Sequence, residues 1–92
     1  MKSLIKQLVE TPGPSGFEYE IRDIIREAIG DAPDEVTVDA LGSLIARKGT
    51  KTEEGLRVMI SAHIDEIGLM VTHVDENGFL RFTNIGGINP LT

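Results

Sequence analysis

The sequence predicts an α/β fold in which two helices come first and strands follow. Apolar residues recur at helical spacing within the first 30 residues. Beyond them, apolar and polar residues alternate with a period of two, which is typical of strands. Near the end of the chain an Asn-Gly pair stands between two apolar runs, and this is the strongest short-range indication of a hairpin.

The first expected helix covers residues 3–10 and should bury one side. A Thr-Pro-Gly-Pro run at residues 11–14 ends it, because proline cannot continue a helix. The stripe that the helix would bury consists of Leu4, Ile5, Leu8 and Val9.

The second expected helix begins at a capping box. The Ser15 hydroxyl would cap the first turn, while Glu18, three residues later, reaches back to the backbone. Gly30 closes this helix. Its buried face would be formed by Phe17, Ile21, Ile24, Ile25 and Ala28.

Five further segments are expected as strands. Alternation at residues 36–39 and a turn at residues 41–43 predict a hairpin whose second strand covers residues 44–46. Residues 56–62 are apolar on both faces, which is typical of an interior strand. The last hairpin would join residues 68–74 to residues 79–82 through the Asn-Gly turn.

Composition narrows the classes of function. The chain has 92 residues, 15 acidic and 9 basic, with a net charge of −6, which argues against electrostatic binding to nucleic acid or to anionic membranes. It has no cysteine, hence no disulfide framework and no thiolate metal site. The first residues lack the continuous apolar core of a signal peptide, and no apolar run has the length of a membrane span. We expect a cytoplasmic protein.

The strand at residues 56–62 also bears on domain organisation. A strand with two apolar faces needs a packed layer on each side, and the turn-rich run at residues 85–92 adds none. We therefore expect the chain to be the front portion of a longer protein. The alternative is a small complete α+β domain with an irregular tail.

Of all the residues, His63 and Asp65 have the types and spacing that most clearly indicate a functional site. On a strand, residues i and i+2 point to the same side. An imidazole can bind a divalent metal through one nitrogen while the other donates to a carboxylate, which fixes the tautomer. Asp65 could be that carboxylate or could touch the metal itself, and spacing does not decide between them. A structural histidine bonded to its neighbour is the alternative, since a catalytic metal needs about three protein ligands.

Other polar residues carry weaker indications. We interpret His73 as a partly exposed or cross-strand residue of the last hairpin rather than a ligand. Glu66 adjoins the site and could act as a base or ligand, although a structural role is favoured. Ser15 and Ser61 have no partners that would make them nucleophiles; capping and strand packing account for them.

Four segments together resemble a known family, the dinuclear-metal aminopeptidases of the glutamyl aminopeptidase and TET type. Some members of that family carry cellulase or endoglucanase labels. The resemblance runs in order over nearly the whole chain and covers about the first quarter of such an enzyme. The segments are residues 11–18, 38–46, 61–71 and 85–90.

The resemblance implies roles for several parts of the chain. His63 would be a metal ligand, and Asp65 would be a catalytic-site residue that orients its imidazole. Two divalent ions, zinc or cobalt, would activate a water that attacks a peptide substrate. Residues 1–66 would be the N-terminal segment of a zinc-peptidase-like catalytic domain. Residues 67–92 would open an inserted β-rich domain used for oligomerisation, and homo-oligomers of twelve subunits are common.

The resemblance also sets limits. Ser43 stands where relatives often have Asn, and the bridging Asp, the catalytic Glu and the other ligands of the family would lie beyond residue 92. We therefore expect this chain alone to lack peptidase activity and not to hold both ions. The alternatives are a truncated, non-catalytic assembly or binding module and, last, a glycoside hydrolase, which needs a pair of carboxylates for which the sequence offers no arrangement.

Overall fold

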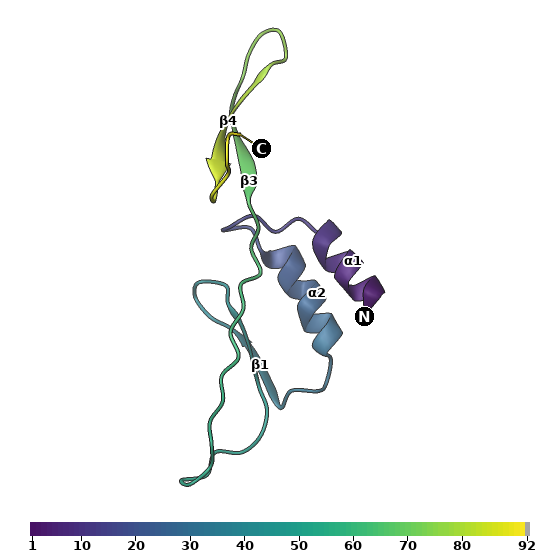
Figure 1. Ribbon diagram of the computed structural model, residues 1–92, viewed down its shortest axis with the longest axis vertical. Coiled ribbons are helices and arrows are strands. Elements are labelled where there is room, and N and C mark those ends of the chain that lie inside the picture. Colours follow the sequence, from purple (N-terminus) through teal and green to yellow (C-terminus); the bar gives the residue numbers. More distant parts are fainter. Residues whose placement is uncertain (92) are drawn as a thin grey trace.

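Two helices open the structure, a computed structural model that describes residues 1–91. Helix α1 spans Lys2–Glu10 and helix α2 spans Tyr19–Ile29, so both predicted helices are confirmed. They lie next to each other on one side of the molecule (Figure 1). The predicted stripe of α1 is only partly covered, because Leu4 and Leu8 are half-buried while Ile5 and Val9 are exposed.

The capping box predicted for α2 is wrong. The helix starts at Tyr19, its N-cap residue is Glu18, and no side chain caps it. Ser15 and Gly16 instead form a turn closed by a 2.8 Å hydrogen bond from Phe17 N to Pro14 O. The Glu18 carboxylate accepts from Gly16 N at 2.7 Å, so it holds the turn before the helix rather than the helix itself.

Two antiparallel hairpins follow the helices, and both were predicted. Strands β1 (Glu35–Val38) and β2 (Leu44–Arg47) form one two-stranded sheet. Strands β3 (Gly68–Val74) and β4 (Leu80–Ile85) form a second, separate sheet with an irregularity between Val71 and His73. The β3–β4 hairpin projects from one end of the molecule (Figure 1).

The strand predicted at residues 56–62 is not formed among the described residues. The segment runs extended past the first hairpin (Figure 1) without ladder hydrogen bonds. Ile60 and Met59, which point to opposite sides of the extended segment, are 93% and 89% exposed, so neither face is buried. The physical reason is that no second strand among residues 1–91 lies along it, and an extended segment alone gains neither ladder bonds nor a packed face.

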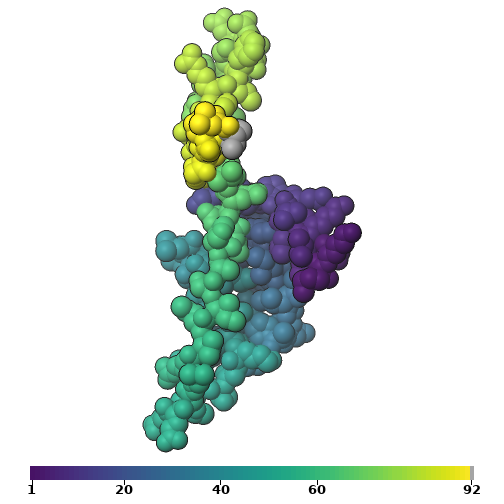
Figure 2. Space-filling model, viewed as in Figure 1, coloured from purple at the N-terminus to yellow at the C-terminus, as the bar shows by residue number. Residues whose placement is uncertain are grey.

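The core of the described residues is very small. Ile21 of α2 is the only large apolar side chain that is buried within residues 1–91, at 5% exposure. The molecule measures 64 × 28 × 25 Å and has a radius of gyration of 18.1 Å, whereas a compact chain of this length would have about 12 Å. The space-filling view shows the same elongated form (Figure 2).

Two remaining expectations concern the ends and the membrane. Within residues 1–91, no helix has the length and apolarity needed to cross a membrane. In the predicted turn-rich run at residues 85–92, Ile85 ends β4 and residues 86–91 continue without regular structure, while Thr92 lies outside the described residues.

Candidate metal centre

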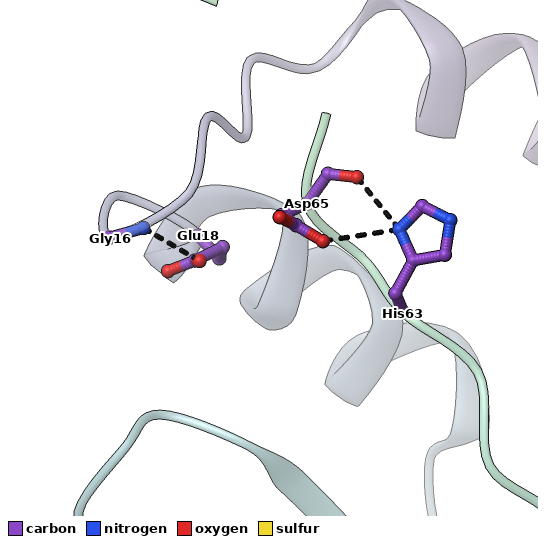
Figure 3. Close-up of polar contacts among 4 residues, drawn as sticks. All are labelled: Gly16, Glu18, His63 and Asp65. Carbon is purple, nitrogen blue, oxygen red and sulfur yellow. Dashed lines mark hydrogen bonds and ion pairs between the residues drawn. The ribbon is translucent and has the colours of Figure 1, made fainter. Parts of the chain in front are cut away.

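The candidate centre lies where the extended segment approaches the start of α2. A short parallel bridge pairs Glu66 with Pro14, and His63 and Asp65 come immediately before it. In this segment the two side chains point toward each other (Figure 3). The local cause is the alternation of an extended chain, which puts residues i and i+2 on one side.

The imidazole of His63 makes two contacts with Asp65. Its Nδ1 atom lies 3.1 Å from Asp65 Oδ1 and 3.0 Å from the Asp65 backbone oxygen (Figure 3). Both oxygens are acceptors, so Nδ1 carries the proton and donates it. In the neutral ring, Nε2 then has a free lone pair. This is the tautomer that a metal-ligating histidine needs when its other nitrogen is held by a carboxylate.

Exposure tells what this pair can contribute. The side chain of His63 is 86% exposed and that of Asp65 is 41% exposed. Solvent competes for a hydrogen bond at such a position, so the contact adds little to stability. Its effect is to orient the ring and to select the tautomer.

A cleft of about 670 Å³ runs beside this pair. One wall consists of residues 58–65 and the other of residues 41–46, with Ile25 and Glu18 of the α2 region completing it. Figure 3 shows Glu18 at the start of α2 together with the His63–Asp65 pair. His63 and Asp65 are therefore among the residues that line a concave region of the surface, the kind of region in which ligand sites occur.

The described residues do not form a complete metal centre by themselves. Among residues 1–91, no group of three or more His, Asp or Glu side chains is arranged to hold an ion. His63 fits a divalent ion as a single ligand, because its tautomer is fixed and Nε2 is free. One ligand does not make a catalytic site.

The other predicted candidates fall elsewhere. His73 lies on β3 opposite Arg81, which confirms the interpretation as a cross-strand residue. Glu66 does not line the cleft; its carboxylate accepts a hydrogen bond from Gly13 N at 3.3 Å. Sequence reasoning missed this contact between residues 53 positions apart, since no local spacing links them.

Comparison with known proteins identifies the family. The family model described as M42 glutamyl aminopeptidase matches residues 42–92, and the chain belongs to this family. Over 91 residues it is 46% identical to the lysyl aminopeptidase of Pyrococcus furiosus, covering 97% of this chain and 25% of that protein. It is 36% identical over 87 residues to the glutamyl aminopeptidase of Lactococcus lactis, covering 95% and 24%. The chain thus spans about a quarter of the length of these relatives.

Solved structures agree with the predicted fold. The TET aminopeptidase of the marine sediment archaeon Thaumarchaeota archaeon SCGC AB-539-E09 superposes with a TM-score of 0.83 at 39% identity, over 94% of this chain and 24% of that chain. PhTET1-12s, a dodecamer, superposes with a TM-score of 0.84 at 40% identity, over 97% and 26%. A Thermotoga maritima protein named endoglucanase gives 0.82 at 36% identity, over 94% and 27%. The α/β class with two leading helices is confirmed.

Proposed function

We propose that this chain is the N-terminal portion of a metal-dependent aminopeptidase. The intact enzyme removes N-terminal residues from peptides with a water molecule activated by two divalent metal ions. Membership of the M42 family supports the reaction class. The observation that carries the assignment to this site is the bond from His63 Nδ1 to Asp65, which leaves Nε2 free beside a cleft.

Each residue of the pair has a distinct task in this proposal. His63 contributes one ligand atom, Nε2. Asp65 holds Nδ1–H and makes the imidazole a better electron donor. A bound pair of divalent ions, zinc or cobalt, supplies a Lewis acid and a water that is nucleophilic near neutral pH. The rest of the ligand set is contributed from outside these residues.

The domain division follows the two sheets. We assign residues 1–66 to the catalytic domain and residues 67–92 to the beginning of an inserted β-rich domain. The separation of β1–β2 from β3–β4, with the second hairpin projecting beyond the helices (Figure 2), supports this boundary. The dodecameric assembly of PhTET1-12s supports a homo-oligomer. We place the enzyme in the cytoplasm, in keeping with the absence of cysteine.

The experiment that tests the proposal uses the full-length natural protein. Its activity should be measured on a panel of aminoacyl-p-nitroanilides with added zinc or cobalt, for the wild type and for His63→Ala. We expect turnover by the wild type, abolition by chelator, and a loss of at least about a hundredfold in His63→Ala. The 92-residue chain alone should show no turnover. Full activity of His63→Ala would contradict the assignment.

A second candidate function is a non-catalytic assembly module. The observation that favours it is the exposed apolar surface of the second hairpin, where Leu69 and Phe82 are 56% and 57% exposed. A module predicts that the 92-residue chain self-associates in sedimentation experiments and that the full-length protein is inactive on every substrate. A glycoside hydrolase comes third. Release of sugar from cellulose oligosaccharides by the full-length protein would favour it.

A further inference from the structure

Glu66 and Gly13 are joined by two hydrogen bonds. Glu66 N donates to Gly13 O at 2.9 Å, and Gly13 N donates to Glu66 Oε1 at 3.3 Å. The neighbouring Pro14 forms the parallel bridge with Glu66. Backbone and side chain of one residue therefore both hold the same glycine.

These two hydrogen bonds between Glu66 and Gly13 are the only ones that attach residues 56–67 to the rest of the described structure. From residue 56 to residue 67, the other hydrogen bonds within residues 1–91 are the two local ones between His63 and Asp65. The segment has no ladder partner along its length. The position of the His63–Asp65 pair relative to α2 is thus set by the attachment at Glu66, one peptide away from Asp65.

At Gly13 there is little space for a larger residue. Gly13 is buried, and a Cβ atom there would lie 3.0 Å from Ile21 Cγ2, the side chain at the centre of the small core. A Cβ atom on Gly68 would lie 3.1 Å from Pro14 Cβ. Because contacts this short are rarely tolerated, both positions favour glycine. The Gly13 amide lies in a part-buried position and needs an acceptor, and the Glu66 carboxylate provides it.

Successive residues of an extended chain point to opposite sides. Asp65 lines the cleft, whereas Glu66 does not and reaches the Gly13 loop instead. This arrangement separates the two adjacent carboxylates by role. It leaves Glu66 without access to the face that His63 and Asp65 share.

We propose that Glu66 is a positioning residue of the metal site: by accepting a hydrogen bond from the Gly13 amide, it fixes the backbone from which Asp65 orients His63. The inference rests on the proposed function, since it assumes that His63 binds a metal ion. In this role the Glu66 side chain must be long enough to reach Gly13 and must carry an acceptor oxygen. It does not need a negative charge directed at the metal or the substrate.

Three substitutions in the full-length protein separate this role from that of a base or ligand. Glu66→Gln keeps an oxygen at the same reach without the charge. Glu66→Asp keeps the charge but is one methylene shorter, and Glu66→Ala removes the acceptor. Glu76→Gln and Glu76→Asp are the matched controls, because Glu76 is an exposed residue of the β3–β4 turn.

Two measurements on each variant are informative. Zinc affinity is measured by competition with a chelator, and hydrogen–deuterium exchange of the metal-free protein is followed in the peptide containing residues 11–17. We expect Glu66→Asp and Glu66→Ala to bind zinc about tenfold more weakly, the lower end for outer partners of a ligand, and to exchange faster at Gly13. Glu66→Gln and both controls should stay within about threefold of the wild type.

Other outcomes overturn the proposal. If Glu66→Asp binds zinc normally while Glu66→Gln does not, the charge matters and Glu66 is a ligand or base. If exchange at Gly13 rises but zinc affinity is unchanged in every variant, the bond is structural only. Failure of the proposed function looks different: His63→Ala would then bind zinc like the wild type, while exchange at Gly13 would still report on the bond from Glu66.

Discussion

Asp39 and Asp75 occupy the same position in two different hairpin turns. Asp39 Oδ1 accepts from Leu41 N at 2.9 Å and Ser43 N at 2.8 Å. Asp75 Oδ1 accepts from Asn77 N and Phe79 N, both at 2.9 Å. In each turn a glycine with positive φ follows, Gly42 at 91° and Gly78 at 83°. An aspartate that binds the amides two and four residues ahead is therefore the shared device that closes both hairpins.

The first prediction concerns the turn of the β3–β4 hairpin. Asp75→Ala removes the acceptor for two backbone amides and should destabilise the hairpin by about 1 kcal/mol, a typical net value for such a bond. Asp75→Asn keeps an oxygen at the same place and should be nearly neutral. Exchange of the Phe79 amide measures this, with a rise of about fivefold expected only in the alanine variant. An equal rise in both variants would show that the charge is the important part.

The second prediction concerns pH. The hydrogen bond from the Ser43 amide, assisted by that from Leu41, lowers the pKa of Asp39. A carboxyl whose pKa is lower in the folded state stabilises that state above its unfolded pKa, and the contribution is lost as pH falls through the folded pKa. The β1–β2 turn should therefore loosen on acidification below about pH 4.

Amide chemical shifts of Leu41 and Ser43, followed from pH 7 to pH 2, test this behaviour. Asp39→Asn is the matched variant, because it keeps the acceptor oxygen and cannot titrate in this range. We expect its turn to show no acid transition. A transition of the same size in the variant would assign the change to another group.

The hairpins and helices could be predicted because their determinants are local. The Asn77-Gly78 pair and the aspartate before it specify one turn within five residues, and the spacing of Ile21, Ile24 and Ile25 specifies α2. The capping box failed because the Ser15 backbone forms a turn of its own and the Glu18 carboxylate binds Gly16. The capping box and the turn at residues 14–17 both require Ser15 and Glu18, and the turn is the one that forms.

In the candidate site, too, the local contact could be predicted from the sequence and the non-local one could not. The His63–Asp65 contact follows from the i, i+2 geometry of an extended chain, so it could be predicted from the sequence. The bond between Glu66 and Gly13 was not, because it joins segments separated by 53 residues. The interior strand failed for a related reason: an apolar pattern predicts that a face will be covered, but it does not name the segment that covers it.

The third prediction separates geometry from charge at the site. Asp65→Asn keeps an acceptor for His63 Nδ1–H. It removes the negative charge that makes Nε2 of the imidazole a stronger electron-pair donor to the metal. We expect zinc affinity of the full-length protein to fall about tenfold in Asp65→Asn and about a hundredfold in Asp65→Ala. Asp23→Asn, on the exposed face of α2, is the control and should bind as the wild type does. Equal losses in both Asp65 variants would mean that Asp65 touches the metal itself.

The last prediction concerns the apolar segment that lies open in this structure. Val58, Met59 and Ile60 are 75%, 89% and 93% exposed, and exposed apolar strands without partners invite pairing with another segment. If the chain is the front portion of a longer enzyme, the remainder should cover this segment on both faces. Amides of residues 56–62 should then exchange at least about a hundredfold more slowly in the full-length protein than in the 92-residue chain. The Lys51–Glu54 region of the adjoining loop is the internal control and should exchange rapidly in both. Rapid exchange at residues 56–62 in the full-length protein would mean that this stretch is not an interior strand of the enzyme, and the position of His63 at its end would lose its structural basis.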